Sequence, residues 1–418
     1  MAVPERREVG ALRHLGDRRR DLVQRIGGGP EHGGALRPEH REIPELGDPG
    51  RRQHRAQHLG HDRWQLRAGQ QPGQCRHAGE DPEVTDAPSR RGFLVIAGAA
   101  AALPGAASAQ PSSGDVPGSE HWTVKRTGGQ DVRLFLWRRN ARTPGPRRGT
   151  MLFVHGSSVS STPVFDLEIP GRPESSTMQW FARKGFDTWC FDCEGYGRAD
   201  KTRPVNADVA CGADDLAAAS EYILRTTGAP KLMLYGASSG ALRAALFAQR
   251  HPERVQRLAL DAMVYTGEGS PTLAERRKRL ASFRASHRRP IDREMIRSIF
   301  TRDHPGTSDL TVVEAFADAV LKLDDSVPTG TYVDMSANLP VCDPAKIPVP
   351  TLVMRGQYDG IASFRDLANF FELLPNPDKQ FIVMPGIAHT STRSKNYAVA
   401  YHVIEQFFSQ PAPVYTGA

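Results

Sequence analysis

The sequence predicts an α/β fold in which a mainly parallel β-sheet is covered by helices on both faces. Short apolar runs typical of strands alternate along the chain with segments whose apolar residues have helical spacing. Several of the strand-like runs are apolar throughout, as expected for parallel strands buried on both faces. In such folds the chemistry lies beyond the carboxyl ends of the strands, so the turns that follow strands are where functional residues are expected.

The regular pattern begins near residue 120. Residues Val132 to Trp137 alternate between apolar and polar side chains, which predicts an edge strand. The other elements of this half are predicted as strand 150–154, helix 178–184, strand 187–192, helix 213–225, strand 231–235, helix 241–250 and strand 257–260.

A long interruption separates the strand that ends at Leu260 from the strand that begins at Thr351. It is longer than a connection inside a compact domain normally is. Its apolar residues predict three helical stretches, at 273–286, 292–301 and 311–323. The sheet then resumes, with the predicted strand 351–354, helix 364–374, strand 380–384 and helix 397–408.

The first 88 residues differ in composition from the rest. They contain arginine but no lysine, phenylalanine or tyrosine, and their few apolar residues have no helical or strand period. Two interpretations stay open: a disordered extension, or a reading frame whose start is placed too early. A nucleic-acid-binding arm is disfavoured, because the basic residues alternate with acids and have no aromatic partners for base stacking.

Residues 89–109 predict an export signal. Ser89 to Leu94 reads SRRGFL, which resembles a twin-arginine signal. The apolar run 93–103 is too short to span a bilayer, and Ala107-Ser108-Ala109 supplies a small-residue cleavage site. We therefore expect a mature chain that begins at Gln110, is handled by the export machinery and resides in the periplasm or outside the cell.

Composition excludes several protein classes. The mean hydropathy of −0.46 and the lack of a long apolar run exclude a multi-span membrane protein and predict no stable membrane insertion of the mature chain. Five cysteines in 418 residues exclude a small disulfide scaffold. The charge of the chain is +7, but the mature part is close to balanced, so nucleic acid is not an expected partner. Whether any disulfide forms stays open.

The strongest functional motif follows the predicted strand 231–235. Gly236-Ala237-Ser238-Ser239-Gly240 is a G-x-S-x-G sequence between a strand and a helix. In this context the turn exposes the hydroxyl of Ser238 at a helix N-terminus, which favours developing negative charge. Ser238 is therefore the predicted nucleophile, although a serine that only caps the helix is the structural alternative.

A serine nucleophile needs a base and a carboxylate that orients it. His389 lies on a glycine-containing loop just beyond the predicted strand 380–384, and it is the predicted base. Asp359 follows the strand 351–354 and is the predicted acid. Asp261, directly after the strand 257–260, is the alternative acid.

Three features of the sequence carry a resemblance: the G-x-S-x-G turn at Ser238, the chain order Ser, Asp, His, and the pair His155-Gly156 after an early strand. With these features the sequence resembles the α/β-hydrolase superfamily, in particular its serine esterases and lipases. The resemblance implies an oxyanion hole made by the backbone N–H groups of Ser239 and of Ser157 or its neighbour Ser158. It also implies a helical cap at 263–345, inserted between the core segments 110–262 and 346–418.

The sequence therefore predicts a hydrolase that cleaves a carboxylic ester of a small molecule by acyl transfer to water. Neither a metal nor an organic cofactor is implied. An amidase or a lactonase would use the same residues, and a non-catalytic binding protein of this fold is the remaining alternative. Residues 271–300 hold nine basic and three acidic residues. This charge is interpreted as a solvated helix face, with attraction of an acidic substrate or an anionic surface as the alternative.

Overall fold

The computed structural model describes residues 116–140 and 147–415. The predicted extension at 1–88 and the predicted signal at 89–109 lie outside the described residues, so they stay predictions.

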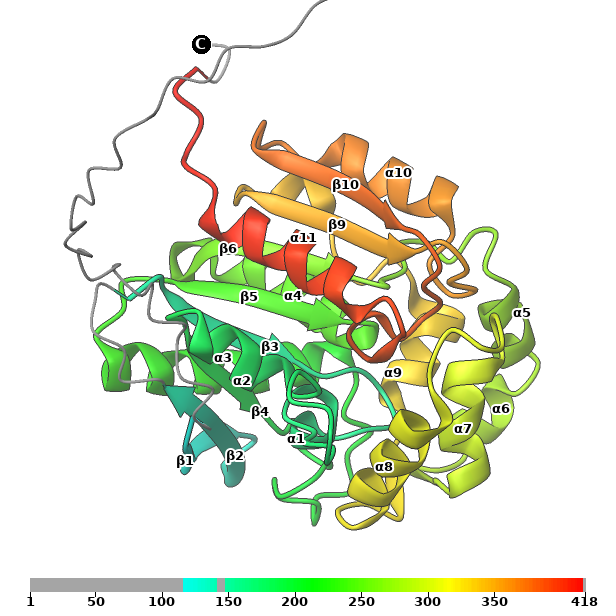
Figure 1. The fold of residues 1–418 in the computed structure, drawn as a ribbon. Helices are drawn as coiled ribbons and strands as arrows, with labels where there is room; N and C mark the ends of the chain where they lie inside the picture. The colour runs from blue at the N-terminus through cyan, green and yellow to red at the C-terminus, as the bar shows by residue number, and fades with distance from the viewer. Residues whose placement is uncertain (1–115, 141–146, 416–418) are drawn as a thin grey trace, which may run out of the picture. The chain divides into compact units, whose positions relative to one another are not determined.

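An eight-stranded sheet forms the centre of the fold, in the order β1-β2-β4-β3-β5-β6-β9-β10 (Figure 1). All pairs from β4 to β10 are parallel, whereas β1 with β2 and β2 with β4 are antiparallel. The strands are β1 (Gly118–Thr127), β2 (Gln130–Asn140), β3 (Thr150–Val154), β4 (Asp187–Phe191), β5 (Leu232–Ala237), β6 (Val255–Asp261), β9 (Thr351–Gly356) and β10 (Lys379–Met384). The predicted α/β-hydrolase sheet is thus present.

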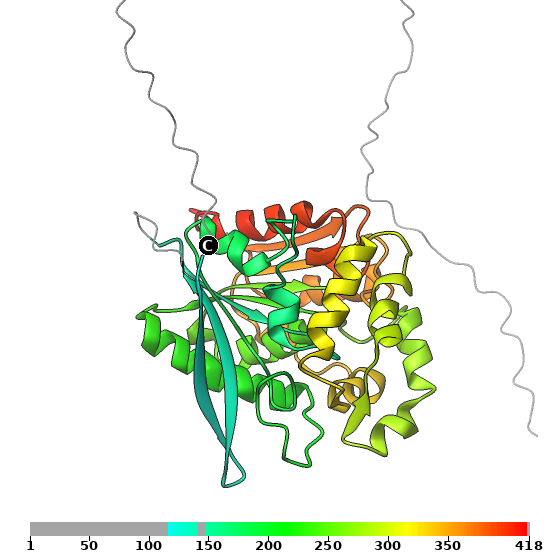
Figure 2. The same ribbon diagram turned by 60° about the horizontal axis from the view of Figure 1, so that its bottom comes forward.

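The hairpin of β1 and β2 corrects the prediction at the start of the sheet. The strand predicted at 132–137 is the central part of β2, which is not an edge strand, because β1 pairs along its outer side. Figure 2 shows the hairpin projecting beyond the other strands. Most residues of β1 are exposed, so its sequence lacks the apolar face that would have identified it.

Helices cover both faces of the sheet. Figure 1 shows α11 (Tyr397–Ser409) in front of the strands and α4 (Ser239–Arg250) behind them. Almost every residue of α4 is buried, because it packs between the sheet and its neighbour α3 (Val209–Thr227). The other core segments are α1 (Ser161–Phe165), α2 (Thr177–Arg183), η1 (Pro252–Arg254), η3 (Pro344–Lys346), α10 (Phe364–Leu373) and η4 (Ser391–Arg393).

The segment between β6 and β9 is the predicted insertion, and it is mostly but not entirely helical. Figure 1 shows it beyond the arrowheads of β5 and β9. One helix was expected at 273–286, but the segment forms two short helices, and a two-stranded antiparallel ribbon of β7 and β8 was not predicted. The elements are α5 (Pro271–Arg277), α6 (Leu280–Arg284), β7 (Arg288–Pro290), α7 (Arg293–Thr301), α8 (Leu310–Leu321), β8 (Ser326–Pro328), α9 (Gly330–Val333) and the π-helical turn η2 (Asp334–Asn338).

The cysteines of the described residues are free thiols: Cys190, Cys193, Cys211 and Cys342. Among the helices of residues 116–140 and 147–415, none combines the length and the apolarity that crossing a membrane requires.

Candidate active site

Ser238 lies at the sharp turn between β5 and α4. Its φ of 56° and ψ of −125° place a non-glycine residue in a strained region of the backbone. The turn is close-packed at its base, because a Cβ at Gly240 would lie 2.1 Å from the carbonyl oxygen of Val154. The N–H of Ser238 donates to the carbonyl of Asp261 at 2.8 Å, which fixes the turn to the end of β6. This packing and this hydrogen bond keep the strained turn in place, with Ser238 at the carboxyl edge of the sheet.

His389 connects Ser238 to Asp359. The Nε2 atom of His389 lies 3.1 Å from Ser238 Oγ, and its Nδ1 atom lies 3.1 and 3.2 Å from the two carboxylate oxygens of Asp359. These partners select the tautomer in which Nδ1–H donates to Asp359 and Nε2 accepts from the serine hydroxyl. The structure thus brings together the three residues that the sequence predicted as nucleophile, base and acid.

The Asp359 carboxylate is buried and fully supported. Its Oδ1 atom accepts hydrogen bonds from the backbone N–H groups of Ile361 and Ala362, at 2.8 and 3.1 Å. Burial alone would raise the pKa of Asp359, but the adjacent His389 and these two N–H groups outweigh burial and hold the pKa below its usual value. Asp359 therefore keeps the negative charge that orients the imidazole ring.

Asp261, the alternative acid, has other partners. Its carboxylate accepts hydrogen bonds from Tyr235 at 2.6 Å and from Ser391 at 3.0 Å. Burial and the nearby charge of Asp359 raise the pKa of Asp261 to about 6, even though these hydrogen bonds act in the opposite direction. Asp261 thus connects β5, next to the nucleophile turn, to η4, just after His389, without pairing with the imidazole.

The loop after β3 lies directly against the nucleophile. A Cβ at Gly156 would lie 3.1 Å from Ser238 Cβ, so glycine permits this close approach. The hydroxyl of Ser157 donates to Ser239 Oγ at 2.8 Å and lies 2.6 Å from Thr331 Oγ1 of α9. Ser239 is the first residue of α4, where backbone N–H groups lack intrahelical partners. The two predicted oxyanion residues therefore lie side by side at the nucleophile turn.

His155, at the start of the same loop, is buried, and both of its ring nitrogens contact backbone groups. Its Nε2 accepts from the N–H of Cys193 at 3.1 Å, and its Nδ1 lies 2.8 Å from the carbonyl of Gly156. Burial, with the charge of Arg243 acting in the same direction, lowers the pKa of His155 to about 3. A neutral His155 thus fixes the loop at Gly156 and leaves His389 as the imidazole that faces Ser238.

The insertion contributes residues to this site that the sequence analysis missed. The side chains of Arg289 and Tyr332 both hydrogen bond to Ser158 Oγ, the latter at 3.2 Å. Asp303, just after α7, has a carboxylate oxygen within 4.8 Å of ligand atoms of both His389 and Asp359. The only related signal in the sequence was the excess of basic residues at 271–300.

Two groups of side chains in the described residues have donor atoms close enough to hold a metal ion. One consists of Asp303 with Asp359 and His389, which the hydrogen bonds above already engage. The other consists of Glu194, Cys211 and Asp215. Lys125 already bonds to all three, at 2.8 Å from Glu194, 3.3 Å from Cys211 and 2.6 Å from Asp215. Both groups are therefore explained by contacts within the chain.

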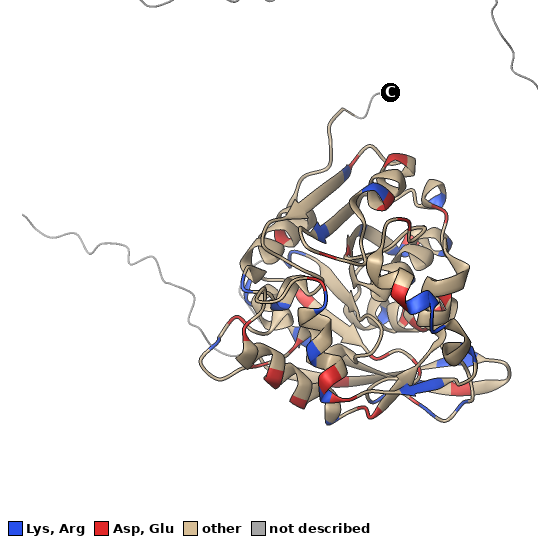
Figure 3. Ribbon diagram, turned by 90° about the vertical axis from the view of Figure 1, so that its right-hand side faces the viewer, with Lys and Arg blue, Asp and Glu red and all other residues tan. Residues whose placement is uncertain are grey.

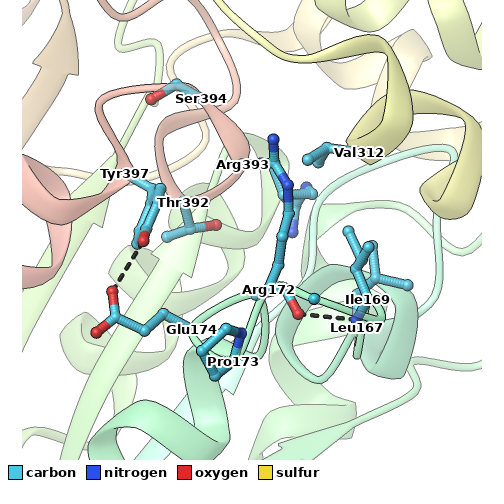
Figure 4. A pocket seen from close by; sticks show the side chains of 12 residues that line it. Leu167, Ile169, Arg172, Pro173, Glu174, Val312, Thr392, Arg393, Ser394 and Tyr397 are labelled. Atoms are coloured by element: carbon cyan, nitrogen blue, oxygen red, sulfur yellow. Dashed lines mark hydrogen bonds between the residues drawn. The ribbon is translucent and has the colours of Figure 1, made fainter.

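A cavity of about 260 Å³ lies between the loop before α2, the helix α8 and η4 (Figure 4). Glu174 accepts a hydrogen bond from Tyr397 at its edge, at 2.8 Å. The Arg393 side chain donates to the carbonyl of Val164 and stacks on Phe316 of α8, with 4.8 Å between the guanidinium carbon and the ring centroid. Ser238, Asp359 and His389 do not line this cavity, which is therefore separate from the triad.

Comparisons with known proteins agree with this architecture. Residues 145–395 match the family model described as serine aminopeptidase, S33. A hydrolase from Pseudomonas aeruginosa PA01 superposes with a TM-score of 0.52 at 16% identity, covering 70% of this chain and 99% of that one. A bromoperoxidase from Bacillus anthracis has a TM-score of 0.50 at 15% identity, with coverages of 70% and 100%. These likenesses show the α/β-hydrolase fold. No curated protein matches the sequence.

Proposed function

The chain belongs to the serine aminopeptidase S33 family of α/β hydrolases, and on this premise we propose that it hydrolyses carboxylic esters with Ser238, His389 and Asp359. The observation that carries the proposal is the position of His389, whose two ring nitrogens lie 3.1 Å from Ser238 Oγ and 3.1 Å from the nearer oxygen of Asp359. An imidazole held between a hydroxyl and a buried carboxylate is the arrangement that activates a serine.

The proposed reaction has two acyl-transfer steps. His389 accepts the proton of the Ser238 hydroxyl as its oxygen attacks the ester carbonyl, and His389 then returns the proton to the departing alcohol. In the second step His389 takes a proton from water as the water oxygen attacks the acyl-enzyme carbonyl. His389 then returns that proton to Ser238 Oγ as the bond to the acyl group breaks and the acid leaves. Asp359 stabilises the imidazolium that forms in each step.

Backbone N–H groups of Ser157 or Ser158 and of Ser239 are the proposed oxyanion donors. The contact of Gly156 with Ser238 and the hydrogen bond between Ser157 and Ser239 support this assignment. Each preorganised donor of this kind typically contributes about 3–4 kcal/mol to stabilisation of the transition state. The insertion, which contacts this loop through Thr331, is proposed as a cap over the site.

A substrate panel tests the ester assignment. The purified protein is assayed with 4-nitrophenyl butyrate, the matching 4-nitroanilide and an aliphatic lactone, with S238A as the control. Measurable turnover of the ester, with a specificity constant above those for the anilide and the lactone and absent in S238A, supports the proposal. A higher specificity constant for the anilide would identify an amidase, and a higher value for the lactone would identify a lactonase.

A further inference from the structure

We propose that Arg276 and Arg289 of the insertion bind an anionic oxygen group of the substrate, so that the enzyme prefers esters with a carboxylate or a phosphate near the scissile carbonyl. This inference rests on the proposed function, because it names the substrate class of the same site. Three features of the two arginines support it: their stacking, their unpaired nitrogens and their position.

The two arginines lie against the same aromatic ring. The guanidinium carbon of Arg276 is 4.2 Å from the ring centroid of Tyr332, and that of Arg289 is 4.0 Å from it. Arg289 also donates to Ser158, which Tyr332 contacts as well. Stacking fixes the planes of both guanidinium groups. Both positive charges are therefore held against one rigid ring.

Both guanidinium groups have shielded nitrogens without a protein partner. Nη1 of Arg276 and Nε of Arg289 are buried, and neither has a hydrogen-bond acceptor within the described chain. A buried charged donor without an acceptor is unfavourable unless a ligand or water supplies one. The unused donors are the feature expected of a site that an anion completes.

Several other basic residues of the insertion are paired with acids. Arg293 bonds to Glu314 and Asp318, and Arg297 bonds to Glu314, at the surface between α7 and α8. Figure 3, which views the insertion side of the domain, shows basic and acidic residues interspersed along the ribbon. Within the surplus of positive charge at 271–300, Arg276 and Arg289 differ from these paired residues by their shared contact with Tyr332.

The local charge remains positive after nearby groups are counted. The charged neighbours of Arg276 are Arg289, Arg302 and Asp303, together with the phenol of Tyr332. Asp303 pairs with Arg302 at 3.2 Å, which neutralises one acid with one base. Arg276 and Arg289 are left without a carboxylate, so a substrate anion would supply the missing charge.

The arginines are close to the reacting atoms. Arg289 contacts Ser158, which is two residues after Gly156, and a Cβ at Gly156 would lie 3.7 Å from Ser238 Oγ. Asp303 is one of the charges that act on Arg276, and its carboxylate lies within 4.8 Å of ligand atoms of His389 and Asp359. The two arginines are therefore linked to the site of the carbonyl that Ser238 attacks, Arg289 through Ser158 and Arg276 through Asp303. Guanidinium groups bind carboxylates and phosphates through paired, charge-assisted hydrogen bonds.

The test compares two esters of the same alcohol and similar length. The specificity constant for the hemisuccinate ester of 4-nitrophenol is divided by that for the butyrate ester, which lacks the second carboxylate. We expect a ratio of roughly ten or more in the native protein, and a decrease of roughly ten- to 100-fold in that ratio in R276Q and R289Q. Arg284→Gln, an exposed change of the same charge on α6, should leave the ratio unchanged.

A binding measurement without catalysis distinguishes a carboxylate from a phosphate as the preferred anion. Succinate and inorganic phosphate are titrated separately into Ser238→Ala, and the tighter ligand identifies the preferred group. A native ratio near one, or a ratio that R276Q and R289Q leave unchanged, would overturn the inference while ester turnover continued. If the native protein hydrolysed neither ester, the result would instead contradict the proposed function. A fluorophosphonate label on Ser238 in each arginine variant checks that the nucleophile remains intact.

Discussion

His389 Nε2 lies 3.1 Å from Ser238 Oγ, although 151 residues separate the two positions in the chain. The contact forms because β5 and β10 are parallel members of one sheet. Their carboxyl ends therefore meet at the same edge, where β5 leads into the Ser238 turn and β10 leads into the loop of His389. The strained backbone of Ser238 then directs its hydroxyl toward the imidazole.

Replacing Asp359 and Asp261 separately tests which carboxylate orients His389. We predict that Asp359→Asn lowers kcat by about 10⁴-fold, because an amide in contact with Nδ1 no longer selects the tautomer that accepts the serine proton. Asp261→Asn should lower kcat by less than about tenfold, since an amide retains one acceptor for Tyr235 or Ser391. Steady-state kinetics with 4-nitrophenyl butyrate measures both, and a larger loss in Asp261→Asn would reverse the assignment.

The raised pKa of Asp261 predicts a pH-dependent contribution to stability. Its pKa is raised from 3.8 to about 6 in the folded state. Below the lower value both states are protonated and nothing is lost. Between pH 3.8 and about 6 the unfolded state ionises this carboxyl while the folded state keeps it protonated, so the free energy of unfolding falls by up to roughly 3 kcal/mol and stays at that lower level above about pH 6. Asp261→Asn lacks this titration.

Urea unfolding of the native protein and Asp261→Asn at pH 4 and pH 7 measures this effect. The free energy of unfolding of the variant, minus that of the native protein, should increase by up to about 3 kcal/mol from pH 4 to pH 7. A difference that does not change with pH would show that Asp261 does not titrate as described.

Lys125 joins the otherwise exposed strand β1 to the core. Its ammonium group lies 2.8 Å from Glu194 and 2.6 Å from Asp215, and all three side chains are almost completely buried. We predict that Lys125→Met lowers the free energy of unfolding by about 3–5 kcal/mol, because the buried Asp215 carboxylate loses its cation and Glu194 keeps only Arg203, at 2.9 Å.

The adjacent Arg126 supplies the matched control. Its ion pair with Asp131 is exposed, so Arg126→Met should change stability by about 1 kcal/mol or less. Denaturant unfolding distinguishes the two variants. Equal losses would mean that the buried cluster adds no more stability than a surface pair.

The phenol of Tyr332 predicts that anion preference depends on pH. Burial raises the pKa of Tyr332, but the charges of Arg276, Arg289 and Arg302, with the hydrogen bond to Ser158, outweigh burial and lower it to about 7. Above that pH a phenolate would cancel one positive charge. The hemisuccinate-to-butyrate ratio should therefore decrease as the pH rises through about 7 in the native protein, and it should stay constant in Tyr332→Phe. If the ratio depended on pH in the same way in the native protein and in Tyr332→Phe, the pH dependence would not come from ionisation of Tyr332.

The sequence was informative where structure is determined locally. The G-x-S-x-G turn identifies Ser238 because the strand, the strained turn and the helix are contiguous, and His389 and Asp359 each follow an apolar strand. The strand β1 was missed because its residues are mostly exposed and its pairing partner defines it. Arg289 and Tyr332 were missed because only the folding of the insertion brings them to Ser158, 131 and 174 residues away.

Covalent labelling with a fluorophosphonate tests the central claim, that Ser238 is an activated nucleophile. The purified protein and Ser238→Ala are treated in parallel, and the adduct is located by intact mass and peptide mapping. We predict one adduct on the peptide that contains Ser238, which is absent from the variant and abolished by His389→Ala. A folded protein that forms no adduct, or forms one equally in Ser238→Ala, would contradict the proposed serine hydrolase mechanism.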